Sequence, residues 1–484
     1  MERQPQQDNT AWSSIKAFLQ PFFPYLSRSE VRESFLNFII SLLSDQRRKN
    51  GWTLAEEMGL NGPQQFQRLL RTARGDWDAI RSKQQYKAQE LLEDEQGVFV
   101  VDETGFIKAG NQSVGVQRQY TGTAGKCENS QVGVFVSYIS SRGRALISTR
   151  LYLPQSWTLD PERCRRAGVP KKTTFATKPE IAADLLDELR DQGWQAPWVT
   201  GDEVYGDNPT FRERQINVGQ KFVLAVSCTQ RVWVRRPVMV SYRLRSGRIK
   251  YKPSPSGPRL RTVQETVSAF RSSRWHRLNM GEGSKGPRVY DWIAKRVIHC
   301  EANEQPGQSF WLLARRSVSK PNEISYYLCQ APVKTKLIEL ARVASARWSI
   351  EESIRDGKQE VGLDDYQVRK WDAWHRHMQL CLISLLLLLH LRQKLNSEDS
   401  QTVPLELVDL NHLNLIRKFS SGAWSIGEIR RVFMIALELP ILNALFRLTW
   451  ALFRHQHNIK AQRSHHEAWF RRHAGPLCKV SLYY

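Results

Sequence analysis

Two short acidic motifs each follow an apolar run that has the composition of a buried strand. Asp102 comes directly after Val98–Val101. Asp202 comes directly after Trp198–Gly201, and each aspartate is followed by a glutamate and, within four residues, by a glycine. Carboxylates at the carboxyl ends of buried strands lie where open α/β sheets place functional groups. Either aspartate alone could equally be a turn residue, but the repeated pattern favours a joint chemical role.

A third acidic position lies in a segment with helical periodicity. On a helix that turns by about 100° per residue, Arg347, Glu351 and Lys358 fall on one stripe that borders an apolar face. Glu352 falls about 100° away from Glu351 and is expected to face solvent. Standing alone, this pattern would indicate an ordinary helix with ion pairs four residues apart. Together with the two aspartates, it adds a carboxylate between two cations.

Three carboxylates with flanking cations suit the cleavage of a phosphodiester. Such cleavage uses two divalent metal ions about 3.5–4 Å apart, which activate the nucleophile and stabilise the leaving oxygen. Magnesium prefers hard oxygen ligands, usually carboxylates and water. Asp102, Asp202 and Glu351 can supply these ligands if the helix packs against the sheet. Arginine and lysine on the same stripe can hold the flanking phosphates.

The elements that must position these residues show an α/β pattern. Short apolar runs predict strands, and the segment Pro179–Gln192 between them predicts a helix. Strands with an intervening helix favour α/β architecture. The expected strands are Val98–Val101, Val132–Ile139, Ala145–Leu153, Trp198–Thr200, Phe222–Val226, 309–317 and 324–329. From about residue 335 onward the chain is predicted to be mostly helical.

The region from about residue 15 to 95 is predicted to be helical and to contact DNA. A helix over Trp52–Leu60, an Asn-Gly-Pro break and a basic helix over Gln64–Arg74 together resemble a helix-turn-helix. An ordinary helical hairpin is the alternative. The basic residues expected to contact DNA are Arg68, Arg71 and Arg74.

The charge of the chain predicts a polyanionic partner. The 484 residues include 71 lysines and arginines against 48 acids, which gives a net charge of +23. Nucleic acid is the first expectation and an anionic membrane the second. Residues 228–290 carry 15 lysines and arginines but only two acids, and tryptophans and tyrosines are interleaved with them. The last 34 residues form a second basic stretch, with six cations and one glutamate.

Composition also narrows the compartment. The N-terminus shows no basic segment followed by an apolar one, so no signal peptide is expected. The most apolar stretch, Met378–Leu391, has 14 residues, and a bilayer span needs about 17–25. A buried core helix is therefore expected, and no membrane partner. The seven cysteines are scattered without C-x-x-C spacing, which favours reduced thiols inside the cell rather than a disulfide framework or a zinc module.

These motifs, in this order, resemble the DDE transposases of bacterial insertion sequences. The cut-and-paste branch of that family carries a helix signature of Tyr, two residues, Arg, three residues, Glu, six residues and Lys. Arg347, Glu351 and Lys358 match its last three positions, whereas Ala344 stands where tyrosine is expected. The gap between Asp202 and Glu351 matches the β-rich insertion of this branch. The segments that look most like the family are 101–108 (VDETGFIK), 114–125 (VGVQRQYTGTAG), 200–206 (TGDEVYG) and 347–366.

The resemblance implies a catalytic site. Asp102, Asp202 and Glu351 would be the catalytic residues and would bind two Mg²⁺ ions per site, for which Mn²⁺ can substitute. Arg347 and Lys358 would contact DNA phosphate near the cleaved end.

The family also stacks a tryptophan of the insertion on a flipped base. Trp275, between the DNA-contacting candidates Arg274 and Arg277, is the first choice, with Trp233 behind it. Trp311 is expected to belong to the core.

The resemblance further implies a fold and partners. The expected fold is an α/β ribonuclease-H-like catalytic core with a β-rich insertion and α-helical flanks. The expected partners are double-stranded DNA, as transposon ends and target, and a second copy of the chain in a homodimer on DNA, in the cytoplasm at the nucleoid. The alternatives are a structure-selective nuclease on the same fold, a non-catalytic DNA-binding protein derived from a transposase and, more distantly, a membrane-surface protein.

The expected division of the chain has five parts. They are a helical DNA-binding domain (1–95), the first part of the core (96–227), the basic β-rich insertion (228–334), the second part of the core with the catalytic helix (335–395) and a helical, basic C-terminal region (396–484).

Overall fold

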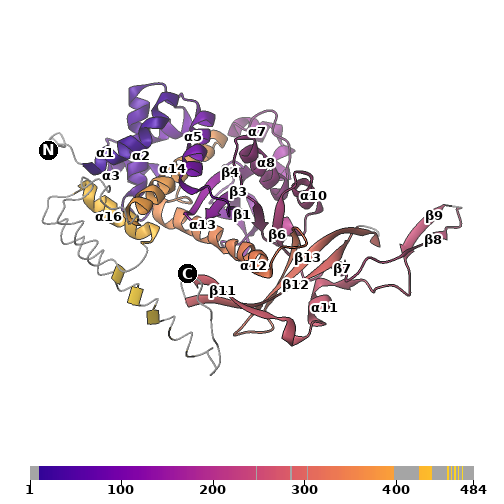
Figure 1. Cartoon of the computed structure of the whole chain (residues 1–484). Coiled ribbons are helices and arrows are strands. Elements are labelled where there is room, and N and C mark those ends of the chain that lie inside the picture. The colour runs from indigo at the N-terminus through magenta and orange to yellow at the C-terminus, as the bar shows by residue number, and fades with distance from the viewer. Residues whose placement is uncertain are drawn as a thin grey trace.

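The computed structural model of the chain is a mixed α/β structure with helical flanks (Figure 1). It describes residues 10–246, 248–283, 286–301, 304–396 and 424–438, together with eight isolated positions between 455 and 471. Most of the expected C-terminal region, 396–484, therefore lies outside the described residues.

One group of helices precedes the sheet and packs on the long helix α14 (Trp371–Asn396). Its members are α1 (Thr10–Leu19), η1 (Gln20–Tyr25), α2 (Ser29–Leu43), α3 (Gly51–Glu57), α4 (Gln64–Arg71) and α5 (Trp77–Leu92). The helix–break–helix prediction is confirmed as α3 and α4. Asn50 begins α3 because its side chain accepts hydrogen bonds from the backbone N–H groups of Trp52 and Thr53.

The middle of the sheet has the strand order β4-β3-β1-β5-β6. β3 is antiparallel to β1 and to β4, whereas β5 is parallel to both β1 and β6. The strands are β1 (Val98–Ile107), β2 (Gln117–Thr121), β3 (Lys126–Ser140), β4 (Gly143–Tyr152), β5 (Trp198–Gly201) and β6 (Lys221–Val226). The helices between them are α6 (Gln155–Thr158), α7 (Pro161–Ala167), α8 (Lys178–Asp191), α9 (Glu203–Gly206) and α10 (Pro209–Asn217).

The expectation that Asp102 ends its strand is wrong. β1 continues to Ile107, because all ten of its residues pair with β3. The polar residues after Val101 look like a strand end in the sequence, yet the ladder with β3 keeps them extended. The parallel pairing with β5 does stop at Val101, opposite Gly201. Asp102 is thus the first residue of β1 beyond that parallel ladder.

The basic segment continues the same sheet. β14 (Ile324–Gln330) pairs with β6, and the order runs on through β13, β12, β7 and β10, with β11 beside β12. Its other strands are β7 (Arg231–Trp233), β10 (Arg261–Thr262), β11 (His276–Gly283), β12 (Gly286–Cys300) and β13 (Pro306–Ser317), and its helices are α11 (Val263–Ser268) and η2 (Ser272–Arg274). A separate two-stranded sheet, β8 (Met239–Arg243) and β9 (Ile249–Pro253), projects at the far right of Figure 1.

The chain then returns to the middle of the sheet through helices. α12 (Leu337–Ala346) packs on β5 and β6, and α13 (Trp348–Val361) packs on β4, α14 and α16 (Ile426–Glu438). The apolar stretch within α14 is buried, with Met378 and Leu386 both fully inaccessible, so the prediction of a core helix is confirmed. Among the described residues, no helix is long and apolar enough to cross a membrane.

Candidate active site

Two aspartates meet at one edge of the sheet. Asp102 follows the last residue pair of the parallel β1–β5 ladder, Val101 and Gly201, and Asp202 follows directly on the β5 side. Asp202 also begins α9, because its Oδ1 accepts a hydrogen bond of 2.9 Å from the backbone N–H of Val204. The local backbone therefore sets the positions of both side chains.

The two aspartates are electrostatically unfavourable as free carboxylates. Burial, together with the nearby charges of Asp202 and Glu103, raises the pKa of Asp102 to about 8. Burial and the charge of Glu103 raise the pKa of Asp202 to about 6. Desolvation penalises each charged form, and like charges close together add to that penalty. A cation placed between these groups would relieve both effects.

Arg347 connects Asp102 to the third carboxylate. It lies at the junction of α12 and α13, where its Nη2 is 2.7 Å from Glu351 Oε1 and its Nη1 is 3.8 Å from Asp102 Oδ2. Burial opposes the charge of Arg347, but Glu351 and Asp102 outweigh it and raise the pKa of the guanidinium. The structure thus brings together the three carboxylates of β1, β5 and α13 around one arginine.

The expectation that Glu352 faces solvent is wrong. Glu352 pairs with Arg144 of β4 at 3.2 Å, and its side chain is 21% exposed, whereas that of Glu351 is 37% exposed. Asp356, one helical turn later, binds the same arginine at 3.0 Å. This face of α13 lies over the sheet, so Glu352 serves the packing of the helix. Glu351 alone of the two glutamates contacts Arg347.

Lys358 lies on the same helix but contacts a different part of the site. Its Nζ donates hydrogen bonds to Thr104 Oγ1 at 2.9 Å, to the Gly105 carbonyl at 3.3 Å and to Thr123 Oγ1 at 3.2 Å. Burial lowers the pKa of its ammonium. Lys358 therefore ties α13 to β1 three residues beyond Asp102.

A fourth carboxylate, Glu103, was missed as a site residue by the sequence analysis. Lys178 Nζ lies 2.8 Å from its Oε1, and the Tyr205 hydroxyl donates to its Oε2 at 2.7 Å. Glu103 is thereby paired with a cation at close range, whereas Asp102 accepts a hydrogen bond of 2.8 Å from the Glu103 backbone N–H and lies 3.8 Å from Arg347. No spacing in the sequence links Glu103 with Lys178, but its place beside Asp102 was a signal that could have been used.

The glycine that closes each acidic motif has a packing role. A Cβ on Gly105 would lie 1.8 Å from Thr121 Oγ1, and one on Gly206 would lie 1.7 Å from the Ala225 carbonyl oxygen. Both distances are impossible, so the neighbouring chain can approach only a glycine there. The repetition noted in the sequence therefore reflects close packing as well as chemistry.

The other expected DNA-contacting residues lie away from this edge. Arg68, Arg71 and Arg74 are exposed on and after α4. Arg68 and Arg74 line an open groove of about 900 Å³ between α2 and α4. Their exposure leaves them available to an external anion.

The tryptophan candidates differ in accessibility. Trp233 is fully buried, so its ring is not available for stacking, and Trp311 is half-buried with its indole N–H donated to the Pro332 carbonyl at 3.3 Å. Trp275 is half-buried, and the guanidinium of Arg316 lies 4.3 Å from its ring centre. Of the flanking residues, Arg274 is exposed and Arg277 pairs with Asp291 at 2.9 Å.

The donor set fits a divalent metal in its chemistry. Within the part of the chain that the structure describes, no three His, Cys, Asp or Glu side chains already stand in metal-binding geometry. Glu351 instead contacts Arg347. Burial, and after it the nearby carboxylates, nevertheless raise the pKa of Asp102 and Asp202, and a hard dication would offset both effects.

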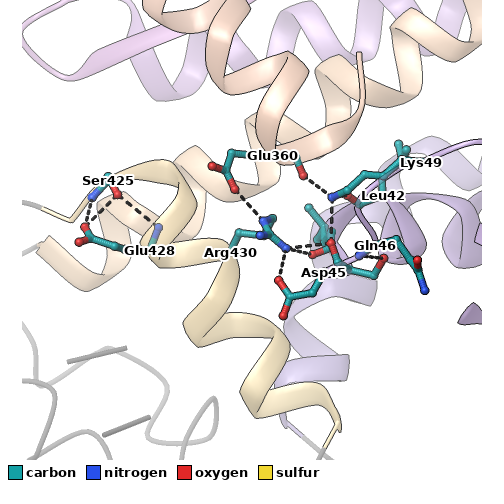
Figure 2. Close-up of polar contacts among 10 residues, drawn as sticks. Leu42, Asp45, Gln46, Lys49, Glu360, Ser425, Glu428 and Arg430 are labelled. Carbon is teal, nitrogen blue, oxygen red and sulfur yellow. Dashed lines mark hydrogen bonds and ion pairs between the residues drawn. The ribbon is translucent and has the colours of Figure 1, made fainter. Parts of the chain in front are cut away.

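The C-terminal end of α13 is held by a buried polar cluster (Figure 2). Arg430 of α16, 9% exposed, lies 2.7 Å from the Glu360 carboxylate and 2.8 Å from that of Asp45, and it donates to the carbonyls of Leu43 and Ser44. Lys49 donates to the Glu360 carbonyl at 2.5 Å. The proposed catalytic helix is thus bound at one point to both α16 and the α2–α3 connection.

Comparison with known proteins adds the family to this geometry. The model of the DDE superfamily endonucleases matches residues 21–287, which is more than half of the chain and includes both aspartates. The chain belongs to this superfamily. The match ends before α13, so it does not include Glu351, and the place of Glu351 in the site rests on the geometry alone. The chain is also 28% identical, over 176 residues, to the probable transposase for insertion sequence element IS701 of Microchaete diplosiphon; this match covers 36% of the chain and 43% of the relative.

Replacing Asp102 by asparagine should stabilise the metal-free protein, because at neutral pH the wild type must take up a proton at this carboxyl group on folding. In EDTA at neutral pH, Asp102→Asn relieves burial and repulsion, so we expect its Tm to rise by a few degrees over wild type in a thermal denaturation. Asp291→Asn is the matched control, because Asp291 is buried between Arg277 and Arg316 and its loss should lower Tm. A lower Tm for both variants would contradict the strained carboxylate pair.

Removing Arg430 should loosen the end of α13. Arg430→Met leaves the Glu360 carboxylate, 15% exposed, without its cation, so we expect the free energy of unfolding to fall by about 3–5 kcal/mol in a urea titration. Arg431→Met, a half-buried neighbour on the same helix, removes the same charge and should cost far less. Equal losses for the two variants would contradict the role of the cluster.

Proposed function

We propose that this protein is a transposase of an insertion sequence. It would bind the terminal inverted repeats, cleave the DNA ends by metal-dependent hydrolysis and join the 3′-hydroxyls to target DNA in a cut-and-paste reaction. One observation carries this proposal: Asp102 and Asp202 meet at one sheet edge, and Glu351 reaches Asp102 through Arg347, in a chain of the DDE superfamily. The similarity to a probable transposase supports the same reading.

The catalytic core would be ribonuclease-H-like. The strand order β4-β3-β1-β5-β6 supports this assignment, with β3 antiparallel to both β1 and β4 on one side and the parallel strands β5 and β6 on the other. The division into five parts, at about residues 95, 227, 334 and 395, remains our proposal for the domains. The continuous β6–β14 pairing means that the insertion would move as one body with the core.

Asp102, Asp202 and Glu351 would hold two Mg²⁺ ions, with Mn²⁺ able to substitute. When bound, the metal ions supply an activated water and charge stabilisation for the leaving oxygen. The residues of the chain have separate tasks in this scheme. Arg347, already placed between two carboxylates, would bind a DNA phosphate once metal neutralises them. Lys358 would bind phosphate beside Thr104.

The partners would be double-stranded DNA, as transposon ends and target, and a second copy of the chain. Arg68, Arg71 and Arg74 would contact the ends, and the basic segment 228–290, with Arg274, Trp275 and Arg277, would contact the DNA near the cleaved strand. The homodimer would hold two ends together on DNA. These events would take place at the nucleoid in the cytoplasm.

Loss of any proposed metal ligand should abolish cleavage but spare binding. We expect Asp102→Ala, Asp202→Ala and Glu351→Ala to cut element ends at least 10³-fold more slowly with Mg²⁺, because each removes a ligand of the reacting centre. Binding of the same ends in a gel-shift assay should stay within a few-fold of wild type. A strand-transfer assay on precut ends then distinguishes a transposase from a nuclease that only hydrolyses.

The two adjacent glutamates of α13 should behave differently. Glu351→Gln should abolish cutting, whereas Glu352→Gln should lower stability through Arg144 and keep most of the cutting activity at low temperature. Thermal denaturation and a cleavage time course on the same preparations separate the two effects. Cutting that survives in Glu351→Gln but is lost in Glu352→Gln would overturn the assignment.

A further inference from the structure

The β8–β9 hairpin is the most isolated element of the described structure. Its two strands pair with each other and stand apart from the large sheet, and it projects away from the N-terminal helices (Figure 1). Hydrogen bonds from Ser254 N to Val238 O and from Leu244 N to Arg248 O close its two ends. A two-stranded hairpin without further packing is marginally stable in water. We therefore expect the exposed hairpin to be stabilised by a binding partner.

The hairpin is joined firmly to the sheet at its base. Arg236 Nη2 donates to the Gly307 carbonyl at 2.8 Å, and Gln305 Nε2 donates to the Tyr251 carbonyl at 3.4 Å. Pro237, the last residue before the projecting part, is buried. The base is thus ordered against the start of β13, although the faces of the hairpin are open.

The charge of the hairpin has one sign. No aspartate or glutamate occurs from residue 214 to 264. The cations on the two strands and the turn between them are Arg243, Arg245, Arg248, Lys250 and Lys252, and all five are exposed. Charged residues, lysine especially, also protect free strand edges against aggregation, a purpose that does not require five cations without one acid. An all-positive set instead selects an anionic partner.

The strand register sorts the side chains into two faces. Tyr242 lies opposite Lys250, and Val240 lies opposite Lys252, so these four residues share one face. Lys252 Nζ lies 5.3 Å from the centre of the Tyr242 ring. The other face carries Arg243, Ile249 and Tyr251, the last two 52% and 59% exposed. The first face therefore offers a tyrosine ring with two lysines, and the second offers a tyrosine ring and one arginine.

We propose that the β8–β9 hairpin is a ribbon that enters the major groove of double-stranded DNA. The major groove, about 12 Å wide, admits a two-stranded β-ribbon as it stands, whereas the minor groove, about 6 Å wide, would have to be widened at a cost in DNA deformation. Lys250 and Lys252 bind the phosphates along the groove, and the ring of Tyr242, on the same face as these lysines, faces the base edges. The choice of DNA as partner rests on the proposed function.

The test measures duplex binding by the full chain in EDTA, where cleavage does not occur. Lys250→Gln combined with Lys252→Gln should weaken binding of a duplex of arbitrary sequence about tenfold at low salt, and should reduce the slope of log K against log [KCl] by about 1.8. Methyl green, which occupies the major groove, should compete with wild type more strongly than with this variant. Circular dichroism should be unchanged, because both lysines are exposed.

The matched control is Lys334→Gln combined with Lys336→Gln. These exposed lysines follow β14, which ends beside the start of β6, so they lie at the sheet edge opposite to Asp102 and Asp202. We expect wild-type affinity and slope for this control. Equal losses for both double variants would show a non-specific effect of charge and overturn the proposal.

Other outcomes are equally decisive. Unchanged duplex binding by the Lys250/Lys252 variant would assign the hairpin to a protein partner instead. A sedimentation coefficient that differs between this variant and wild type without DNA would assign it to a second copy of the chain. The proposed function fails separately, if wild type binds DNA but neither cuts nor joins it with Mg²⁺. Binding in EDTA and cleavage with metal thus test the two proposals independently.

Discussion

Repulsion between buried carboxylates is the constraint around which this molecule is organised. The parallel ladder of β1 and β5 ends at Val101 and Gly201, so Asp102 and Asp202 leave it side by side. Burial raises the pKa of both groups, and the charge of Glu103 raises both further, joined at Asp102 by that of Asp202. A fold tolerates such a site only where other interactions offset its cost in stability. Groups with shifted pKa values cluster at functional sites, where a bound ligand or ion can compensate their charge. The cations around it do not pair most closely with the two aspartates. Arg347 lies nearest to Glu351, and Lys178 pairs with Glu103.

The compensating interactions converge on α13. Its first turn is fixed through Arg347, and its last turn through the hydrogen bonds of Lys358 to β1 and through the Glu360–Arg430 pair. Glu352 adds a fourth attachment to Arg144 of β4. A helix bound at four points along its length cannot rotate to exchange Glu351 for Glu352. Packing therefore places Glu351, and not Glu352, beside Arg347 and Asp102.

Sequence reasoning located the elements and carboxylates whose signals are local. Short apolar runs predicted β5, β6 and the start of β1, and the helical stripe placed Arg347 beside Glu351, because both patterns are properties of neighbouring residues. It was wrong about Glu352, since a helical wheel does not contain Arg144, which comes from a strand some 200 residues earlier. The Glu103–Lys178 pair and the Arg430 cluster escaped for the same reason. Long-range polar contacts leave no periodic trace in the chain.

The distribution of charge follows from the continuity of the sheet. Negative charge is concentrated where β1 meets β5, and positive charge on the strands that extend the sheet beyond β6 through β14. Because backbone ladders connect the two regions, their separation is set by rigid pairing rather than by a linker. A DNA duplex bound by the basic strands beyond β6 would then meet Asp102 and Asp202 at a fixed distance from where it is bound. For this distance, the positions of the cations along the sheet matter more than the net charge of +23.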